Sequence, residues 1–234
     1  MFDVFIIAAG DGQRLKEEGI LTPKPLIEIN GVPLILRLIN VAVQNGASSI
    51  SCIINEQSDK LKQFLGSCKI DIPFNLIVKS TPSSLHSFYE LKKYLSSERF
   101  LLTTTDSIFL EDEFKSFVNF CINHKKAEGI LAVTDFIDDE KPLYVELDNE
   151  TKIRRFSDTS NNCNYVTGGL YFFHRSVLNN LETSINASTN RLRNYLKLLA
   201  IESHKLYAFK FSKIIDVDHA ADINKAEEFL QSSI

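Results

Sequence analysis

The amino-acid sequence predicts an α/β fold, a Rossmann-like three-layer arrangement in which helices cover both faces of a mostly parallel central sheet. Three observations predict it. Short apolar runs alternate with helical patterns through the first half of the chain, as strands joined by crossover helices require. The first run, Val4–Ala9, is apolar, as a strand buried on both faces should be. Gly10 and Gly12 follow it directly, at the sheet edge where such folds bind ligands.

The first half of the chain contains the alternation. Apolar runs predict strands at Val4–Ala9, Ile50–Ile54, Phe74–Lys79, Phe100–Thr105 and Gly129–Thr134. Apolar residues at helical spacing predict helices at Pro33–Asn45, Pro82–Leu95 and Glu111–His124. In the first of these helices, Pro33 occupies the first helical position and Gly46 follows the end, as is typical of a helix start and stop.

The second half changes to strands joined by polar turns. The expected elements are strands Leu143–Leu147, Ile153–Phe156 and Tyr165–Phe173, helix Thr189–Glu202, strands Leu206–Phe211 and Ile214–Val217, and a helix from Ala220 to about Leu230. No linker rich in Pro, Gly or Ser separates the halves. We therefore expect one domain over residues 1–234, in which residues 136–234 pack across residues 1–135.

Composition excludes several classes of protein. The 234 residues are 44% hydrophobic and 24% charged, which argues against a disordered or collagen-like chain. The net charge of −4 provides no overall field for nucleic acid or an anionic membrane. No signal peptide and no apolar run of roughly 20 residues is visible, so we expect a soluble, cytoplasmic protein. The four cysteines form no CxxC pair and are expected to be reduced core residues.

The segment after the first strand carries the strongest chemical signal. Gly10 and Gly12 let backbone N–H groups approach a nucleotide closely. Arg14 can bind phosphate oxygens as a fork, and Lys24, between two prolines, adds a second cation. A dinucleotide fingerprint would need glycine in place of Leu15, and no Gly-Lys-Ser/Thr follows for a Walker A loop. The simpler alternative is a tight turn with a solvated Arg and Lys.

A longer pattern around these residues points to a family. Ala-Ala-Gly-x-Gly-x-Arg at 8–14, Pro-Lys-Pro-Leu at 23–26 and Asn-Gly-Val-Pro-Leu-Ile at 30–35 resemble the signature of the nucleotidyltransferases. These are the sugar-1-phosphate nucleotidyltransferases (NDP-sugar pyrophosphorylases) with relatives such as MobA-like NTP transferases and phosphocholine cytidylyltransferases. The resemblance covers nearly the whole chain. It implies the fold of the nucleotide-diphospho-sugar transferases, with an NTP-binding half at 1–135 and an acceptor-binding half at 136–234.

The resemblance also implies a reaction. This is Mg²⁺-dependent transfer of a nucleoside monophosphate from an NTP to a small phosphorylated acceptor, with release of pyrophosphate. A sugar 1-phosphate is the favoured acceptor, and phosphocholine or a phosphonate is the alternative. A third possibility is an inactive regulatory homologue that only binds nucleotide or sugar phosphate. Arg14 and Lys24 would bind the NTP phosphates. The implied residues of the NTP loop are Ala8, Ala9, Gly10 and Gly12.

Carboxylates at two strand ends are the candidate metal ligands. Asp106 ends the strand Phe100–Thr105, and a carboxylate beside phosphates suits Mg²⁺. It could also be a cap before the next segment, but the family places a metal Asp here. The family usually has a second metal Asp near residue 216, where the register fits either Asp216 or Asp218. Two residues apart on a strand, both should face one side. The surrounding motifs favour Asp216, and the alternative for either is a helix N-cap.

The acceptor side is less clearly marked. The segment Tyr165–Phe173 resembles the Val-Thr-Gly-Leu-Tyr segment of sugar nucleotidyltransferases, which implies that Thr167, Gly168 and Gly169 touch the sugar. The alternative is a core strand with a glycine bulge. The family's Glu-Lys-Pro motif is missing, and Arg154 or Arg155 is expected to replace its Lys, since one of two successive strand residues points inward.

Two serines are candidates for contacting the base. Ser83 and Ser84 occupy the family's base-recognition position, although they could equally belong to a helix N-cap. The five histidines show no spacing typical of metal ligands and are expected to be structural. The choice of NTP, the acceptor and a possible homo-oligomeric state remain open at this stage.

Overall fold

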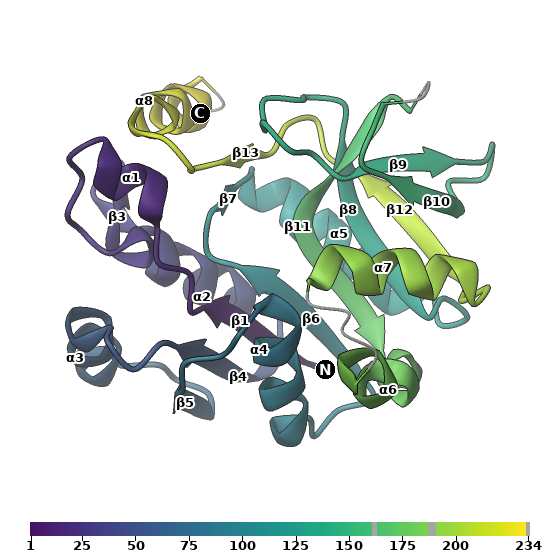
Figure 1. The fold of residues 1–234 in the computed structure, drawn as a ribbon, viewed down its shortest axis with the longest axis horizontal. Helices are drawn as coiled ribbons and strands as arrows, with labels where there is room; N and C mark the ends of the chain where they lie inside the picture. The colour runs from purple at the N-terminus through teal and green to yellow at the C-terminus, as the bar shows by residue number, and fades with distance from the viewer. Residues whose placement is uncertain (161–162, 187–190, 233–234) are drawn as a thin grey trace.

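The central sheet of the protein joins both halves of the chain. The computed structural model describes residues 1–160, 163–186 and 191–232, without the side chain of residue 186. In these residues a nine-stranded sheet has a parallel core formed by four strands. In spatial order these are β5 (Phe74–Val78), β4 (Ala47–Ile54), β1 (Phe2–Ala8) and β6 (Arg99–Thr104). The predicted three-layer α/β class with a mostly parallel sheet is confirmed (Figure 1).

One antiparallel strand interrupts the parallel order. The long strand β11 (Tyr165–His174) lies between β6 and β8 (Gly129–Thr134) and is antiparallel to both. Beyond β8 lies β12 (Leu206–Lys210), which is parallel to it. A hairpin of β9 (Tyr144–Leu147) and β10 (Ile153–Ser157) pairs with the beginning of β11.

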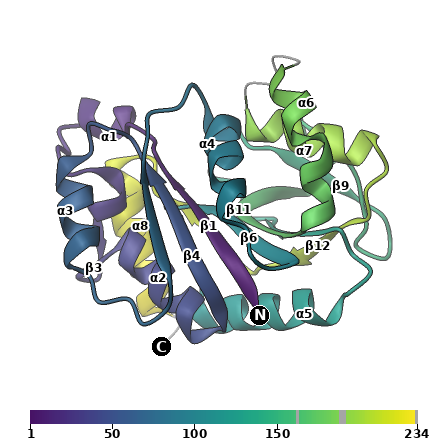
Figure 2. The same cartoon turned by 90° about the horizontal axis from the view of Figure 1, so that it is seen from below.

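Helices cover both faces of the sheet (Figure 2). One face packs against α2 (Leu34–Gln44), α3 (Asp59–Ser67) and α5 (Glu111–Asn123). The other packs against α4 (Ser84–Leu91), α6 (Leu181–Asn186) and α7 (Leu192–Ile201). The sheet is thus enclosed by two apolar layers, which leaves its edges and strand ends for polar chemistry.

Several element boundaries differ from the expectation. The predicted helix Pro82–Leu95 is α4 followed by a 3₁₀ turn at Lys92–Tyr94. Helix α7 begins at Leu192, and the first two residues predicted for it, Thr189 and Asn190, lie outside the described residues. The predicted strand Ile214–Val217 is only β13 (Ile215–Asp216), because its partner β7 (Ser107–Ile108) offers two residues for pairing.

Short elements surround the end of β1. They are α1 (Gln13–Glu17), a 3₁₀ turn at Lys24–Leu26, and the hairpin of β2 (Glu28–Ile29) and β3 (Val32–Pro33). The last helix, α8 (Ala220–Gln231), lies beside them (Figure 1). No helix in the described part of the chain is long and apolar enough to cross a bilayer.

A buried carboxylate stabilises the end of the sheet where the parallel strands begin, opposite the strand ends that carry the site. Asp3, at the start of β1, is fully buried and accepts backbone N–H bonds from Ser96 and Ser97, each at 2.7 Å. Hydroxyls of Ser48 and Ser49 donate to it at 3.0 and 2.9 Å. Burial alone would raise the pKa of Asp3, but these bonds outweigh it and lower the pKa.

We expect Asp3→Asn to lower the free energy of unfolding by about 2 kcal/mol at neutral pH, because charge-assisted bonds are lost and donors stay unpaired. A lowered folded-state pKa stabilises the fold above the unfolded pKa, and this contribution is lost as pH falls through the folded value. The difference from wild type should therefore shrink below about pH 4. Urea titrations at neutral and acidic pH check this, and a difference that persists in acid would contradict it.

Candidate functional site

The site begins where β1 ends. The chain turns after Ala8 and enters α1 through Gly12, whose φ of 60° lies in the left-handed region. A Cβ atom at Gly12 would lie 3.2 Å from the Cβ of Lys24. Gly12 therefore serves both as the turn residue and as the point of close approach between the loop and Lys24.

A small apolar cluster lies beneath the polar residues and positions them. Its buried members are Leu15, Ile27, Ile29, Leu34, Ile108, Ile215, Val217 and Ala226. Asp216 lies between two of these members in sequence, Asp218 follows one, and Arg14 precedes another. Because side chains alternate along extended chain, burial of Ile215 and Val217 directs Asp216 and Asp218 toward the site.

Ion pairs bring residues from distant parts of the chain together. The Nζ of Lys24 donates to Asp106 Oδ2 at 2.6 Å and to Asp218 Oδ1 at 2.5 Å. The other oxygen of Asp218 accepts from Arg14 Nη1 at 2.7 Å. Burial would lower the pKa of Lys24, but the charges of Asp106 and Asp218 outweigh it and raise the pKa. Lys24 therefore remains a cation.

Two carboxylates at the strand ends have opposite pKa shifts. Asp216 Oδ1 accepts from Ser107 Oγ at 2.8 Å. Burial, with the negative charge of Asp106, raises the pKa of Asp216 to about 7. For Asp106 burial acts in the same direction, but the adjacent Lys24 ammonium outweighs it and lowers the pKa. The repulsion between Asp106 and Asp216 favours a cation placed between them.

A divalent ion fits this pair chemically. Mg²⁺ usually takes one or two carboxylates and completes its shell with substrate phosphates and water. The described residues contain no cluster of three or more His, Cys, Asp or Glu in metal-binding positions. The two carboxylates of Asp106 and Asp216 fit the number of protein ligands that Mg²⁺ usually takes.

Two cavities meet at these charges. The first has a volume of about 520 Å³ and is lined by every predicted NTP-side residue: Ala8, Ala9, Gly10, Gly12, Arg14, Lys24, Ser83 and Ser84. The second is only about 40 Å³ and is lined by Thr167, Gly168 and Asp216, among others. Arg14 and Asp218 line both cavities, so these two residues mark the point where the cavities adjoin.

The two glycines of β11 have packing roles. A Cβ on Gly168 would lie 2.1 Å from Ile214 Cδ1, and one on Gly169, whose φ is 76°, would lie 2.4 Å from Ser107 Oγ. The register of β11 against β8 shifts between Thr167 and Tyr171. The glycine-bulge interpretation therefore describes this strand, and Gly169 gives Ser107 the room to reach Asp216.

The structure does not bring Arg154 and Arg155 to the site. Both are exposed on β10, and Arg155 pairs with Glu146 of the neighbouring strand β9. A register irregularity between Ile153 and Arg155 breaks the strict alternation on which the inward orientation depended. Neither arginine is among the described residues that line the two cavities.

The serines serve as caps as well as cavity lining. Ser83 is the N-cap of α4, accepts the backbone N–H of His86 at 3.5 Å and lies 2.9 Å from its Nδ1. Ser84 Oγ accepts the N–H of Leu192 at 3.2 Å. Ser83 thus has the N-cap role that was the alternative to base contact, and both serines also line the larger cavity. By contrast, the N-cap of α8 is His219, so neither Asp216 nor Asp218 fills that position.

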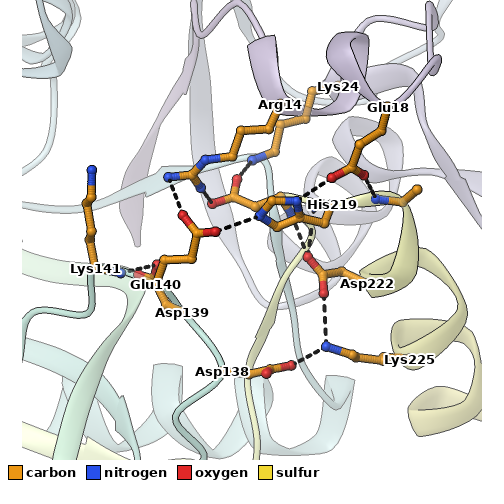
Figure 3. Close-up of polar contacts among 12 residues, drawn as sticks. Arg14, Glu18, Lys24, Asp138, Asp139, Glu140, Lys141, His219, Asp222 and Lys225 are labelled. Atoms are coloured by element: carbon orange, nitrogen blue, oxygen red, sulfur yellow. Dashed lines mark hydrogen bonds and ion pairs between the residues drawn. The ribbon is translucent and has the colours of Figure 1, made fainter.

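Three residues of the site were not predicted from the sequence. Glu140 pairs with Arg14 Nη2 at 3.4 Å and with His219 Nε2 at 3.5 Å (Figure 3). Ser107 holds Asp216. His219 was expected to be structural, and its Nδ1 lies 2.5 Å from Oε1 of Glu18. The available signals were the acidic run around Glu140 and the adjacency of Ser107 to Asp106.

Comparisons with known proteins place the chain in a family. A family model described as Nucleotidyl transferase matches residues 4–233. Mannose-1-phosphate guanylyltransferase catalytic subunit beta of Drosophila melanogaster is 27% identical over 184 residues, 76% of this chain and 49% of that protein. The bifunctional protein GlmU of Methanococcus vannielii is 24% identical over 244 residues, 99% of this chain and 56% of that protein. The chain thus spans about half the length of these curated relatives.

A solved structure shares the whole fold. The inositol-1-phosphate CTP transferase from T. maritima superposes with a TM-score of 0.81 at 21% sequence identity, covering 99% of this chain and 95% of that chain. At this identity the likeness shows the fold alone.

Proposed function

Because the chain belongs to the nucleotidyl transferase family, we propose that it transfers a nucleoside monophosphate from an NTP to a sugar 1-phosphate and releases pyrophosphate. One observation carries the proposal. Arg14, Lys24 and Asp106 converge at the end of a nucleotide-sized cavity, and Asp216 lies in the adjoining one. Sugar 1-phosphates appear in the names of similar proteins, which supports this acceptor class.

The proposed reaction is an in-line displacement. An oxygen of the acceptor phosphate forms a bond to the α-phosphorus while the bond to the bridging β-phosphate oxygen breaks, and pyrophosphate leaves with the electron pair. Catalysis of this kind depends on positioning and charge neutralisation. Arg14 and Lys24 are cations at the end of the larger cavity, where they would stabilise charge on the departing pyrophosphate. No covalent intermediate on the protein is needed.

A Mg²⁺ ion would neutralise phosphate charge when bound with the NTP. Asp106 and Asp216 are the residues that we propose hold it. Asp218 is the weaker candidate because both of its oxygens already bind cations, Lys24 and Arg14. Its proposed role is to hold those two cations in position.

The test is pyrophosphate release over a grid of substrates. Each of the four NTPs is combined with mannose 1-phosphate, glucose 1-phosphate, inositol 1-phosphate, phosphocholine and a phosphonate, with and without Mg²⁺. We expect release with a sugar 1-phosphate and a metal. Release confined to phosphocholine or the phosphonate would reassign the acceptor. Nucleotide binding without release across the grid would favour an inactive regulatory homologue.

We expect Lys24→Ala to lower kcat/KM about 10- to 150-fold, because a charge-assisted contact to phosphate contributes roughly 1.5–3 kcal/mol. Lys24 also separates two carboxylates, so its loss should lower stability as well. Steady-state kinetics and thermal unfolding measure the two effects. Lys16→Ala, which removes the same charge from an exposed position on α1, is the control, and kinetics equal to it would refute the role.

A further inference from the structure

The segment between β8 and β9 covers the acceptor-side cavity. Residues 135–143 form neither helix nor strand. Phe136, Asp138, Asp139, Glu140 and Pro142 of this segment line the cavity together with Thr167 and Asp216. A volume of about 40 Å³ holds a few water molecules at most, whereas small-ligand sites usually exceed about 300 Å³. A sugar phosphate therefore fits in this cavity only if part of its lining moves.

Charged side chains contact this segment at several points. Arg193 Nη2 donates to the carbonyl oxygen of Lys141 at 2.7 Å, and Lys213 Nζ lies 4.1 Å from the centroid of the Phe136 ring. Figure 3 shows the contacts of Glu140 and Asp138. Glu140 places one oxygen 3.4 Å from Arg14 Nη2 on α1 and the other 3.5 Å from His219 Nε2 at the start of α8. Asp138 accepts from Lys225 Nζ of α8 at 2.6 Å. The side chains of Glu140 and Asp138 are 59% and 43% exposed, and exposed ion pairs contribute little each. The ion pairs of Glu140 are thus weak enough to be displaced.

The contact of Glu140 with Arg14 links the segment to the nucleotide cavity. Arg14 lines both cavities, and its guanidinium is shared between Asp218 and Glu140. A polyphosphate carries more charge than a carboxylate and offers the paired oxygens that a guanidinium fork prefers. A phosphate bound at Arg14 therefore competes directly with Glu140.

We propose that residues 135–143 are a lid over the acceptor cavity, that Glu140 latches it to Arg14 and His219, and that polyphosphate binding at Arg14 releases the latch. The inference rests on the proposed function for the identity of the anion. Glu140 acts through Arg14 and the lid, so it is a positioning residue that need not touch either substrate.

Hydrogen exchange of the lid peptide, read by mass spectrometry with inorganic pyrophosphate as the probe, tests the latch without depending on the acceptor. In the absence of pyrophosphate, Glu140→Gln should speed exchange of residues 135–143 by about 2- to 30-fold, the range expected for losing two exposed ion pairs. Pyrophosphate should raise wild-type exchange to the same level and leave the variant unchanged. Asp135→Asn, which removes a charge from an exposed position of the same segment, should behave as wild type.

The outcomes separate the two proposals. If calorimetry detects no pyrophosphate binding to wild-type protein, the proposed function fails at its phosphate site. If pyrophosphate binds but wild-type exchange stays constant or slows, the lid proposal is overturned and the proposed function is not. Equal exchange of Glu140→Gln and wild type, or an equal gain in Asp135→Asn, also overturns the latch. Circular dichroism verifies that each variant is folded.

Discussion

Asp106→Asn is expected to lower Mg²⁺-dependent turnover by at least about 100-fold. This is the upper end of the losses seen when a group that hydrogen-bonds to a metal ligand is removed. The carboxylate lies just after β6, where Lys24 pairs with it. Burial, with the charge of Asp106, raises the pKa of Asp216. Asn keeps the shape of the side chain but removes the charge that would bind a divalent ion. Pyrophosphate release across a Mg²⁺ titration measures the loss.

The stability of Asp106→Asn distinguishes a functional residue from a structural cap. The variant loses one ion pair, but Lys24 retains Asp218 and the repulsion with Asp216 disappears. These effects oppose each other, so we expect a net change below about 1 kcal/mol and a shift in Tm of at most about 4 °C. Asp71→Asn removes the same charge from an exposed site and is the control. An unfolded Asp106→Asn protein would mean that the carboxylate is needed for the fold.

The parallel core could be predicted from the sequence because each of its strands is locally encoded. All five apolar runs of the first half are strands in the structure, within a few residues at the ends. The position of β11 between β6 and β8 could not be predicted, because it depends on pairing between residues such as Leu170 and Thr103. Helix α3 was not predicted, because it is polar and buries only Leu61 and Leu65.

The sequence likewise indicated some residues of the candidate site but not their contacts. Arg14, Lys24 and Asp106 lie in a short motif and at a strand end, so the sequence alone indicated them. The contacts of Glu140 could not be found in this way, because they join segments that meet only in three dimensions. Alternation failed for Arg154 and Arg155 because one irregularity in β10 leaves both exposed. Local patterns thus identify residues that carry charge, whereas the fold determines which charges meet.

The second large effect is expected for Asp216→Asn, which should lose more activity than Asp218→Asn. Asp216 is bound by the neutral hydroxyl of Ser107 and lies near Asp106, whereas Asp218 is bound by two cations. A metal ion would relieve the unfavourable charge at Asp216 but would have to displace Lys24 or Arg14 to reach Asp218. We therefore expect Asp216→Asn to lose at least about 100-fold in turnover and Asp218→Asn about 10- to 100-fold.

Magnesium titrations of the two variants decide between direct and indirect roles. Asp218→Asn keeps both proposed ligands, Asp106 and Asp216, so a raised Mg²⁺ concentration should restore part of its activity by mass action. Asp216→Asn lacks a ligand, so saturating Mg²⁺ should leave its maximal turnover low. Asn at position 216 can still accept the Ser107 hydroxyl, which makes unfolding an improbable cause of the loss. The reverse ranking, with rescue of Asp216→Asn alone, would assign the metal to Asp218 and require Lys24 to leave that carboxylate when nucleotide binds.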